Sequence, residues 1–424
     1  MLKFAKDPEL RDRKLDQIYN NGTDQFETTV IVISIDGFRP DYLNRGLTPH
    51  LRNLGESGVI AKYMHPAFPP NTFPNHWTLA TGLYPEAHGI VANLFYDPSL
   101  NDTFVATKKE SSLNPKWWKG EPIWATAKKN KMRTASIMWP GSEGSYHPPD
   151  HVVNYNGTMR PIEKMEIITD WLDLPFDKRP QLITMYIPQI DMQGHQGGPF
   201  GTKMNELIKE TDDSIGYLVS KLEERNLKSH VHIVVLSDHG MSEVSDKKVI
   251  YYDEIVSPAL LKHVRSREAF PLLDLRPNPN APKNTTQTLY QQLVNYTQSV
   301  SEPHFQVYLR DDVPARFHYR NSERITPVVA IPDPGYTFAT REEILKYGFN
   351  QGGNHGYDNL AEEMRAIFIA SGPKVQHYYR PGTVLVPFFN VEVYRFLTDL
   401  LNIDAAANNG TMEGDFPPIY IPPF

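Results

Sequence analysis

Three apolar runs, rich in β-branched residues, each end at or shortly before an aspartate. They are Val30–Ile35 before Asp36, Gln181–Ile187 before Asp191, and Val231–Leu236 before Asp238. Runs of this kind are typical of buried parallel strands, and ligands of open α/β sheets bind beyond the carboxyl ends of such strands. Because helical segments alternate with these runs, the sequence predicts an α/β protein with a doubly wound, mostly parallel sheet. Its functional site is expected at the carboxyl edge of that sheet.

The remaining elements follow the same pattern along the chain. Helices are expected over Thr48–Ser57 (with Thr48 as N-cap), Glu121–Asn130, Pro161–Leu172, Lys203–Arg225 and Asn390–Leu401. Further strands are expected at Arg133–Met138 and Arg365–Ala370. Residues 1–28 are predicted to be a polar lead-in with a short helix over Pro8–Tyr19, and the tail FPPIYIPPF an extended segment. Residues 29–424 would then form one catalytic domain.

The regular alternation of strands and helices is interrupted between residues 247 and 340. A helix is predicted over Thr286–Val300, and FQVYLRDD, ARFHYR and TPVVAIPDP are predicted to be short strands. This composition favours a small inserted α+β subdomain lying over one end of the sheet.

Composition restricts the chemistry. The net charge is −7, so a wide basic surface for a nucleic-acid duplex is not expected. The chain has no cysteine, which excludes thiolate metal sites, catalytic thiols and disulfides. Any metal must therefore take oxygen and imidazole ligands.

Six N-x-S/T sequons favour the secretory route. They are Asn21, Asn101, Asn156, Asn284, Asn295 and Asn409. No stretch reaches the roughly 18 apolar residues of a membrane span. The N-terminal residues are charged rather than signal-like. The chain is expected to be an extracellular ectodomain whose leader or anchor is missing, or else a cytosolic protein.

Thr72 precedes Phe73-Pro74 and the helix-like segment TLATGLY. Proline is favoured in the first turn of a helix, so Thr72 is expected at a helix N-terminus, where unpaired N–H groups favour anions. Taken alone, Thr72 is more typical of a simple N-cap than of a nucleophile. Opposite the Asp36 carboxylate, however, its hydroxyl would suit a nucleophile directed at phosphorus.

Three further clusters carry metal-ligand side chains. Asp191 and His195 lie four residues apart in a predicted glycine-containing turn, Asp238 and His239 are adjacent, and His355 lies in the glycine-rich GGNHGYDN. Each cluster alone is more typical of a turn, a cap or a loop, but together they follow successive predicted strands. With Asp36 and Thr72 they would supply two divalent ions with three or four ligands each. Two such ions can clamp the attacking and leaving sides of an in-line displacement at phosphorus.

Five segments together resemble one known family. They are ISIDGFRPDY, NTFPNHWTLATGLYPEAHGIVANLFYD, DMQGHQGGPFG, LSDHGM and GGNHGYDN. In this order they resemble the nucleotide pyrophosphatase/phosphodiesterases of the alkaline phosphatase superfamily. The resemblance implies an alkaline phosphatase-like fold and two zinc ions. One ion would be held by Asp36, Thr72, Asp238 and His239, and the other by Asp191, His195 and His355.

The resemblance also implies roles around the substrate. Thr72 would be the nucleophile that forms a phosphothreonyl intermediate, and Asn93 would hydrogen-bond a non-bridging phosphate oxygen. A nucleoside slot would comprise Phe73 and Tyr155 stacking the base, Trp139 on the floor, Tyr186 near the phosphate and Glu143 near the nucleoside. Stacking contributes about 1–3 kcal/mol per base with little selectivity. Trp139 and Tyr186 are equally consistent with core packing.

The expected function is a two-zinc phosphodiesterase that releases a nucleoside 5′-monophosphate from nucleoside triphosphates, dinucleotides or nucleotide sugars. Asn71 and Leu94 occupy positions where some triphosphate-hydrolysing relatives carry lysines, so a triphosphate tail is expected to bind less strongly. Two alternatives remain open. In the first, the same metals would serve a choline-type phospholipid headgroup or a phosphomonoester. In the second, the chain would be a non-catalytic binding ectodomain.

Overall fold

The structure, a computed structural model, describes residues 18–349 and 352–411. Its centre is an eight-stranded sheet in the order β21-β4-β20-β11-β3-β10-β8-β9. These strands are β21 (Thr383–Leu385), β4 (Val59–Ala61), β20 (Phe368–Ser371), β11 (Val231–Leu236), β3 (Thr29–Ile35), β10 (Leu182–Ile187), β8 (Thr134–Ile137) and β9 (His151–Val153). Neighbours are parallel except where β20 takes part, so the predicted mostly parallel sheet is confirmed.

The direction of β20 follows from where the chain returns to the sheet. β11 ends at the carboxyl edge, and the chain returns to that edge at His355. Only one short 3-10 helix, Glu362–Met364, separates His355 from β20. Without a crossover to the opposite edge, the next strand must run antiparallel to β11.

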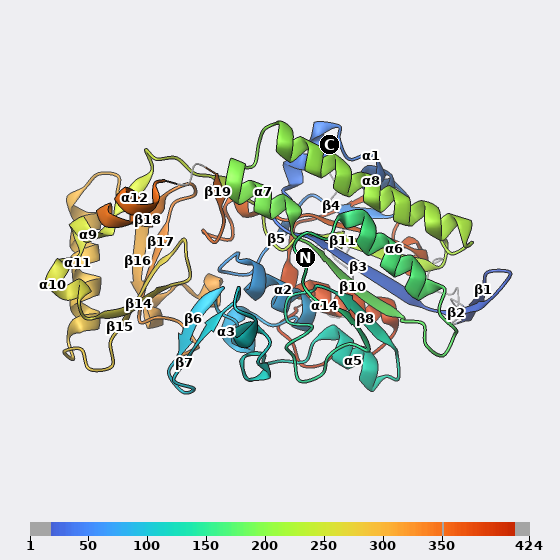
Figure 1. Ribbon diagram of the computed structural model, residues 1–424, viewed down its shortest axis with the longest axis horizontal. Coiled ribbons are helices and arrows are strands. Elements are labelled where there is room, and N and C mark those ends of the chain that lie inside the picture. The colour runs from blue at the N-terminus through green and yellow to red at the C-terminus, as the bar shows by residue number, and fades with distance from the viewer. Residues whose placement is uncertain (1–17, 350–351, 412–424) are drawn as a thin grey trace, which may run out of the picture.

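Helices cover both faces of the sheet (Figure 1). One face carries α1 (Pro49–Ser57), α6 (Pro161–Leu172) and α8 (Thr202–Glu224), and the other carries α2 (Thr72–Thr81), α5 (Ile123–Lys129), α13 (Pro373–Tyr378) and α14 (Val393–Leu401). Alternate residues of β3 pack into the apolar cores on the two faces of the sheet, because successive side chains of a strand point to opposite faces. Ile31 and Ile33 pack beneath the first group of helices, and Val30 and Val32 beneath the second.

Residues 249–347 build a third apolar core beside one end of the central sheet (Figure 1). A four-stranded antiparallel sheet has the order β14-β15-β17-β16. Its strands are β14 (Val264–Glu268), β15 (Leu273–Pro277), β17 (Val328–Pro332) and β16 (Phe305–Leu309). Around it lie β13 (Val249–Tyr251), β18 (Thr337–Ala339), α9 (Tyr252–Ile255), α10 (Pro258–Leu261), α11 (Thr285–Ser299) and α12 (Arg341–Tyr347). The boundaries predicted for an inserted subdomain, 247 and 340, stay a prediction.

Further short strands and α-helices precede or lie between these elements. They are β1 (Ile18–Asn20), β2 (Gln25–Glu27), β5 (Met64–His65), α3 (Pro85–His88), β6 (Leu94–Asp97), β7 (Asp102–Val105), α4 (Lys109–Ser112), α7 (Gln189–Gly197), β12 (Ser242–Glu243), β19 (Gly353–Asn354) and β22 (Phe388–Phe389).

The strand predicted at ARFHYR is wrong. Ala315–Phe317 forms a 3-10 helix, and His318 has a φ of +48°, which ends any extended run. Thr48 lies at the N-cap of α1 as predicted, but its side chain forms no cap hydrogen bond. The carboxylate of Asp212 on α8 instead accepts the first free N–H groups of α1. The predicted helix over Pro8–Tyr19 lies mostly outside the described residues, and its last two residues, Ile18 and Tyr19, belong to strand β1 instead. The tail FPPIYIPPF lies outside the described residues entirely.

A buried amine beneath the sheet makes stability depend on pH. Lys164 of α6 has no exposed surface, and its Nζ donates to the Tyr186 carbonyl at 2.8 Å. Burial lowers the pKa of Lys164 from 10.5 to about 7. Between these values the unfolded chain binds a proton that the folded protein does not, so stability rises with pH.

We expect Lys164→Met to remove a rise of up to about 1.4 kcal/mol per pH unit between pH 7 and 10.5. Urea unfolding across that range measures it. Lys209→Met, on the exposed side of α8, is the matched control and should keep the wild-type slope. The same slope in both variants would contradict the assignment.

Candidate active site

Three buried carboxylates meet at the carboxyl edge of the sheet. Asp36 follows β3, Asp238 follows β11, and Asp191 lies in α7 just after β10. The predicted turn between Asp191 and His195 is wrong, since both lie on helix α7. Residues four apart on a helix share a face, and His195 Nε2 is 3.3 Å from Asp191 Oδ2.

The first predicted ligand set comes together around His239. Its Nε2 lies 3.4 Å from Asp36 Oδ1 and 3.1 Å from Asp238 Oδ2. Thr72, the first residue of α2, has its Oγ1 3.4 Å from the same nitrogen. The threonine hydroxyl therefore faces the cluster from the N-terminus of a helix.

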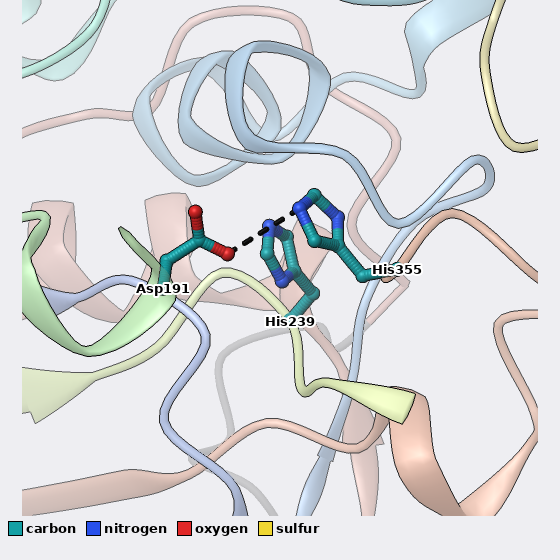
Figure 2. Close-up of side chains that lie close together, drawn as sticks. All are labelled: Asp191, His239 and His355. Carbon is teal, nitrogen blue, oxygen red and sulfur yellow. Dashed lines mark ion pairs between the residues drawn. The ribbon is translucent and has the colours of Figure 1, made fainter. Parts of the chain in front are cut away.

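The second predicted set adjoins the first. His355 Nε2 lies 3.3 Å from Asp191 Oδ1 and 3.1 Å from His195 Nε2. The rings of His239 and His355 stack with their centroids 3.6 Å apart. Figure 2 shows Asp191, His239 and His355 converging from three different segments of the chain. The two sets thus form one continuous cluster.

The buried carboxylates of this cluster favour the binding of cations. Among the described residues, Asp36 Oδ1, Asp191 Oδ1 and Asp238 Oδ2 are buried and accept no hydrogen bond. Burial, and then the charges of Asp191 and Asp238, raise the pKa of Asp36, and burial also raises the pKa of Asp191. Burial acts the same way on Asp238, but His239 and His76 outweigh it and hold its pKa well below the usual value. Oxygen and imidazole donors in this arrangement fit divalent cations.

Gly37 allows the carboxylates to approach one another. Its φ is +66°, a conformation that favours glycine, and a Cβ here would lie 3.2 Å from Asp191 Cβ. The Gly37 N–H donates to Asp238 Oδ1 at 3.2 Å. The Asp-Gly pair after β3 therefore turns the chain and lets the three carboxylates lie close together.

His76 is a site residue that sequence reasoning missed. It is fully buried on α2, with Nδ1 2.8 Å from the Thr72 carbonyl oxygen and 3.3 Å from Asp238 Oδ2. Its Nε2 lies 2.9 Å from Ser34 Oγ in β3. The available signal was its position four residues after Thr72, on the same helical face. His76 ties the start of α2 to a carboxylate of the cluster.

Asn93 and Phe73 lie beside Thr72. Asn93 Oδ1 accepts the Phe73 N–H at 3.0 Å, which brings its amide to the N-terminus of α2. The Phe73 ring is partly buried against Phe104 and Trp118, with centroids 5.9 and 6.1 Å away. Their roles in substrate binding stay predictions.

The other four predicted pocket residues differ in exposure. Tyr155 is 48% exposed, and its backbone N–H donates to Glu143 Oε1 at 2.7 Å. Tyr186 is buried 6.5 Å from Tyr155, ring to ring, and its hydroxyl donates to Asp36 Oδ2. Trp139 is buried in the core, with Nε1 donating to the His76 carbonyl. Tyr155 thus offers a surface for stacking, whereas Tyr186 holds a carboxylate of the cluster.

A third group, His50, Asp212 and Asp213, also brings possible ligands together. Both carboxylate oxygens of Asp212 accept backbone N–H groups of α1, from His50 and Leu51. This group is therefore explained as a helix cap.

Comparison with known proteins identifies the family. Residues 30–358 match the profile of type I phosphodiesterases / nucleotide pyrophosphatases. The chain belongs to this family. It is 44% identical over 407 residues to an uncharacterized pyrophosphatase/phosphodiesterase of Schizosaccharomyces pombe, covering 94% of this chain and 82% of that protein. Human ectonucleotide pyrophosphatase/phosphodiesterase family member 1 is 37% identical, and the match covers 91% of this chain but only 41% of the longer human protein.

Solved structures of the family confirm the predicted fold. Murine ectonucleotide pyrophosphatase/phosphodiesterase 5 superposes with a TM-score of 0.81 at 31% identity, covering 90% of this chain and 97% of that one. An inactive threonine-to-alanine variant of the murine protein, in complex with AMP, gives a TM-score of 0.80 at 31% identity and covers 91% and 98%. This type I phosphodiesterase / nucleotide pyrophosphatase is therefore a hydrolase with an alkaline phosphatase-like α/β fold. Within its described residues, no helix is both long and apolar enough to cross a bilayer.

Proposed function

We propose that this enzyme cleaves phosphodiester or phosphoanhydride bonds of nucleotides and releases a nucleoside 5′-monophosphate through a phosphothreonine at Thr72. The observation that carries the proposal is the position of Thr72 Oγ1. It lies at the N-terminus of α2, 3.4 Å from His239 Nε2, and faces the cluster of aspartates and histidines. The AMP bound to the inactive murine relative supports a nucleoside 5′-monophosphate as product.

Two zinc ions are the proposed cofactors. The donor set contains only carboxylate, imidazole and hydroxyl groups, and three buried carboxylate oxygens of the described cluster accept no hydrogen bond. Asp36, Thr72, Asp238 and His239 would hold one ion, and Asp191, His195 and His355 the other. When bound, the ions would supply the positive charge that stabilises the attacking and leaving oxygens.

The protein's own groups would orient the reaction. The Thr72 oxygen would attack phosphorus in line and displace the leaving group, and water would later hydrolyse the phosphothreonine. Asn93 would donate from Nδ2 to a non-bridging phosphate oxygen, because its Oδ1 already accepts the Phe73 N–H. The first backbone N–H groups of α2 would add to this anion site.

A nucleoside is the proposed occupant of the space near Phe73 and Tyr155. The exposed Tyr155 ring supports base stacking, and Glu143 lies within hydrogen-bonding distance of the Tyr155 backbone. Trp139 and Tyr186 would line the inner end. We propose nucleoside triphosphates, dinucleotides and nucleotide sugars as substrates, with no duplex nucleic acid among them.

A panel of p-nitrophenyl substrates tests the substrate class. We expect kcat/KM for a nucleoside 5′-p-nitrophenyl phosphate to exceed that for p-nitrophenylphosphorylcholine by about 5- to 150-fold, the range that one stacked base contributes. Plain p-nitrophenyl phosphate should be the poorest substrate. A preference for the choline ester would indicate a headgroup phosphodiesterase, and a preference for the plain phosphate a monoesterase.

We also propose that the protein passes through the secretory pathway as a glycoprotein and acts outside the cell. Five of its six sequon asparagines, all but Asn21, are exposed. Exposed sequons are what a glycosylating compartment can modify.

A further inference from the structure

The turn Ala269–Pro271, between β14 and β15, touches three segments of the proposed active site. The Ala269 N–H donates to the Leu94 carbonyl at 3.3 Å, directly after Asn93. Asn71 Nδ2 donates to the Phe270 carbonyl at 3.4 Å, directly before Thr72. The turn is therefore attached to both chain segments that carry the proposed nucleophile and its phosphate-binding neighbour.

The third contact lies next to His355. At Gly356, whose φ is +115°, a Cβ would lie 2.4 Å from Pro271 Cδ and 2.5 Å from Asn71 Oδ1. No side chain fits between these atoms, so the turn packs directly against the backbone that follows His355. Contacts on three sides fix the turn at the rim of the cluster.

This fixed turn presents an aromatic ring to solvent. Ala269 and Leu272 are buried, whereas Phe270 is 51% exposed and Leu94 beside the turn is 38% exposed. The ring rests on Arg267, whose guanidinium carbon lies 5.2 Å from the ring centroid. Arg267 itself donates to the Phe338 carbonyl at 2.7 Å, and this hydrogen bond keeps the guanidinium beneath the Phe270 ring.

The turn adjoins a ligand proposed for the second ion, His355, whereas Tyr155 lies on the side of Asp36, a ligand proposed for the first. Tyr155 lies near Tyr186, which is bonded to Asp36. His239 lies beside Asp36, and its ring stacks on that of His355. Gly356, the residue after His355, packs against the turn. A substrate whose first base stacks at Tyr155 would therefore extend its leaving group toward Phe270.

We propose that Phe270, with Leu94 beside it, forms a leaving-group subsite that stacks the second base of a dinucleotide. The inference rests on the proposed function. Phe270 and Leu94 offer this part of the substrate exposed apolar side chains, which suit an aromatic base. The proposal assigns dinucleotides as the preferred substrate class.

NAD and ADP-ribose test the subsite directly, because they share the adenosine diphosphate-ribose portion and differ only in the nicotinamide ring. We expect the wild-type enzyme to release AMP from NAD with the higher kcat/KM. Phe270→Ala should lower the NAD to ADP-ribose ratio of kcat/KM by about 5- to 150-fold, the range for one stacked base. Phe270→Tyr, which keeps a ring, should preserve most of the ratio.

Phe176→Ala is the matched control. Phe176 is another exposed phenylalanine, 44% exposed, but it lies shortly before β10 begins, at the amino edge of the sheet. Its loss should leave the ratio unchanged. An unchanged ratio in Phe270→Ala, or an equal fall on both substrates, would overturn the subsite while leaving the proposed function intact. Failure of the wild-type enzyme to release AMP from either substrate would overturn both.

Discussion

Replacing Thr72 by alanine is expected to lower kcat for nucleotide hydrolysis by at least about a thousandfold, the scale on which loss of a nucleophile acts. Bound metal and AMP affinity should remain. The reason is local, because Thr72 Oγ1 faces His239 at 3.4 Å and supplies the attacking oxygen. Steady-state kinetics with a nucleoside p-nitrophenyl ester and calorimetric titration with AMP measure the two quantities separately.

Thr81→Ala provides the control within the same helix. The Thr81 hydroxyl is also buried, but it donates to the Trp77 carbonyl, away from the cluster. This variant should lose some stability and keep its kcat. Residual activity above about one tenth of wild type in Thr72→Ala would remove Thr72 from its proposed role, since the nucleophile cannot be dispensable.

Replacing His239 by alanine is expected to release bound zinc and to lower kcat/KM by about a thousandfold or more, since metal ions contribute several kcal/mol to such reactions. His239 is the imidazole that belongs to both candidate metal groups, one with Asp36 and Asp238 and one with Asp191 and His355. Its removal takes the shared imidazole from both groups. Elemental analysis of purified protein should find two zinc ions per wild-type chain and fewer in the variant.

His50→Ala is the matched control for the metal measurement. His50 also lies beside two aspartates, but that group caps helix α1. The variant should keep two zinc ions and full activity. Treating the wild-type protein with a chelator should reproduce the loss seen in His239→Ala, with recovery on adding zinc. Full zinc occupancy in His239→Ala would contradict the proposed ligand set.

The sequence predicts the central sheet well because its strands are buried on both faces. Val231–Leu236 is apolar except for His232, and its predicted limits agree with β11. The strand near Arg365–Ala370 was predictable, but its direction was not, because direction depends on the edge at which the chain returns. ARFHYR shows the opposite case. Its hydrophobic content resembles a strand, yet the left-handed backbone of His318 ends the run.

The ligand cluster could be predicted because parallel strands deliver their carboxyl ends to one edge. Asp36 and Asp238 follow neighbouring strands, and their spacing requires no knowledge of side-chain packing. His76 was missed because its partners, Ser34 and Asp238, are distant in sequence and meet only in the folded protein. Phe270 was missed for the same reason, since only its backbone contacts bring it to the site.

The central claim is that Asp36, Asp191, His195, Asp238, His239 and His355 hold two ions with the Thr72 oxygen directed at one of them. Anomalous diffraction at the zinc edge, from crystals of the wild-type protein grown with zinc and AMP, tests it most directly. The account predicts two zinc peaks, one beside Thr72 and His239 and the other beside His195 and His355, with the AMP phosphate in contact with both. Zinc peaks elsewhere, or a Thr72 hydroxyl that faces no ion, would contradict it.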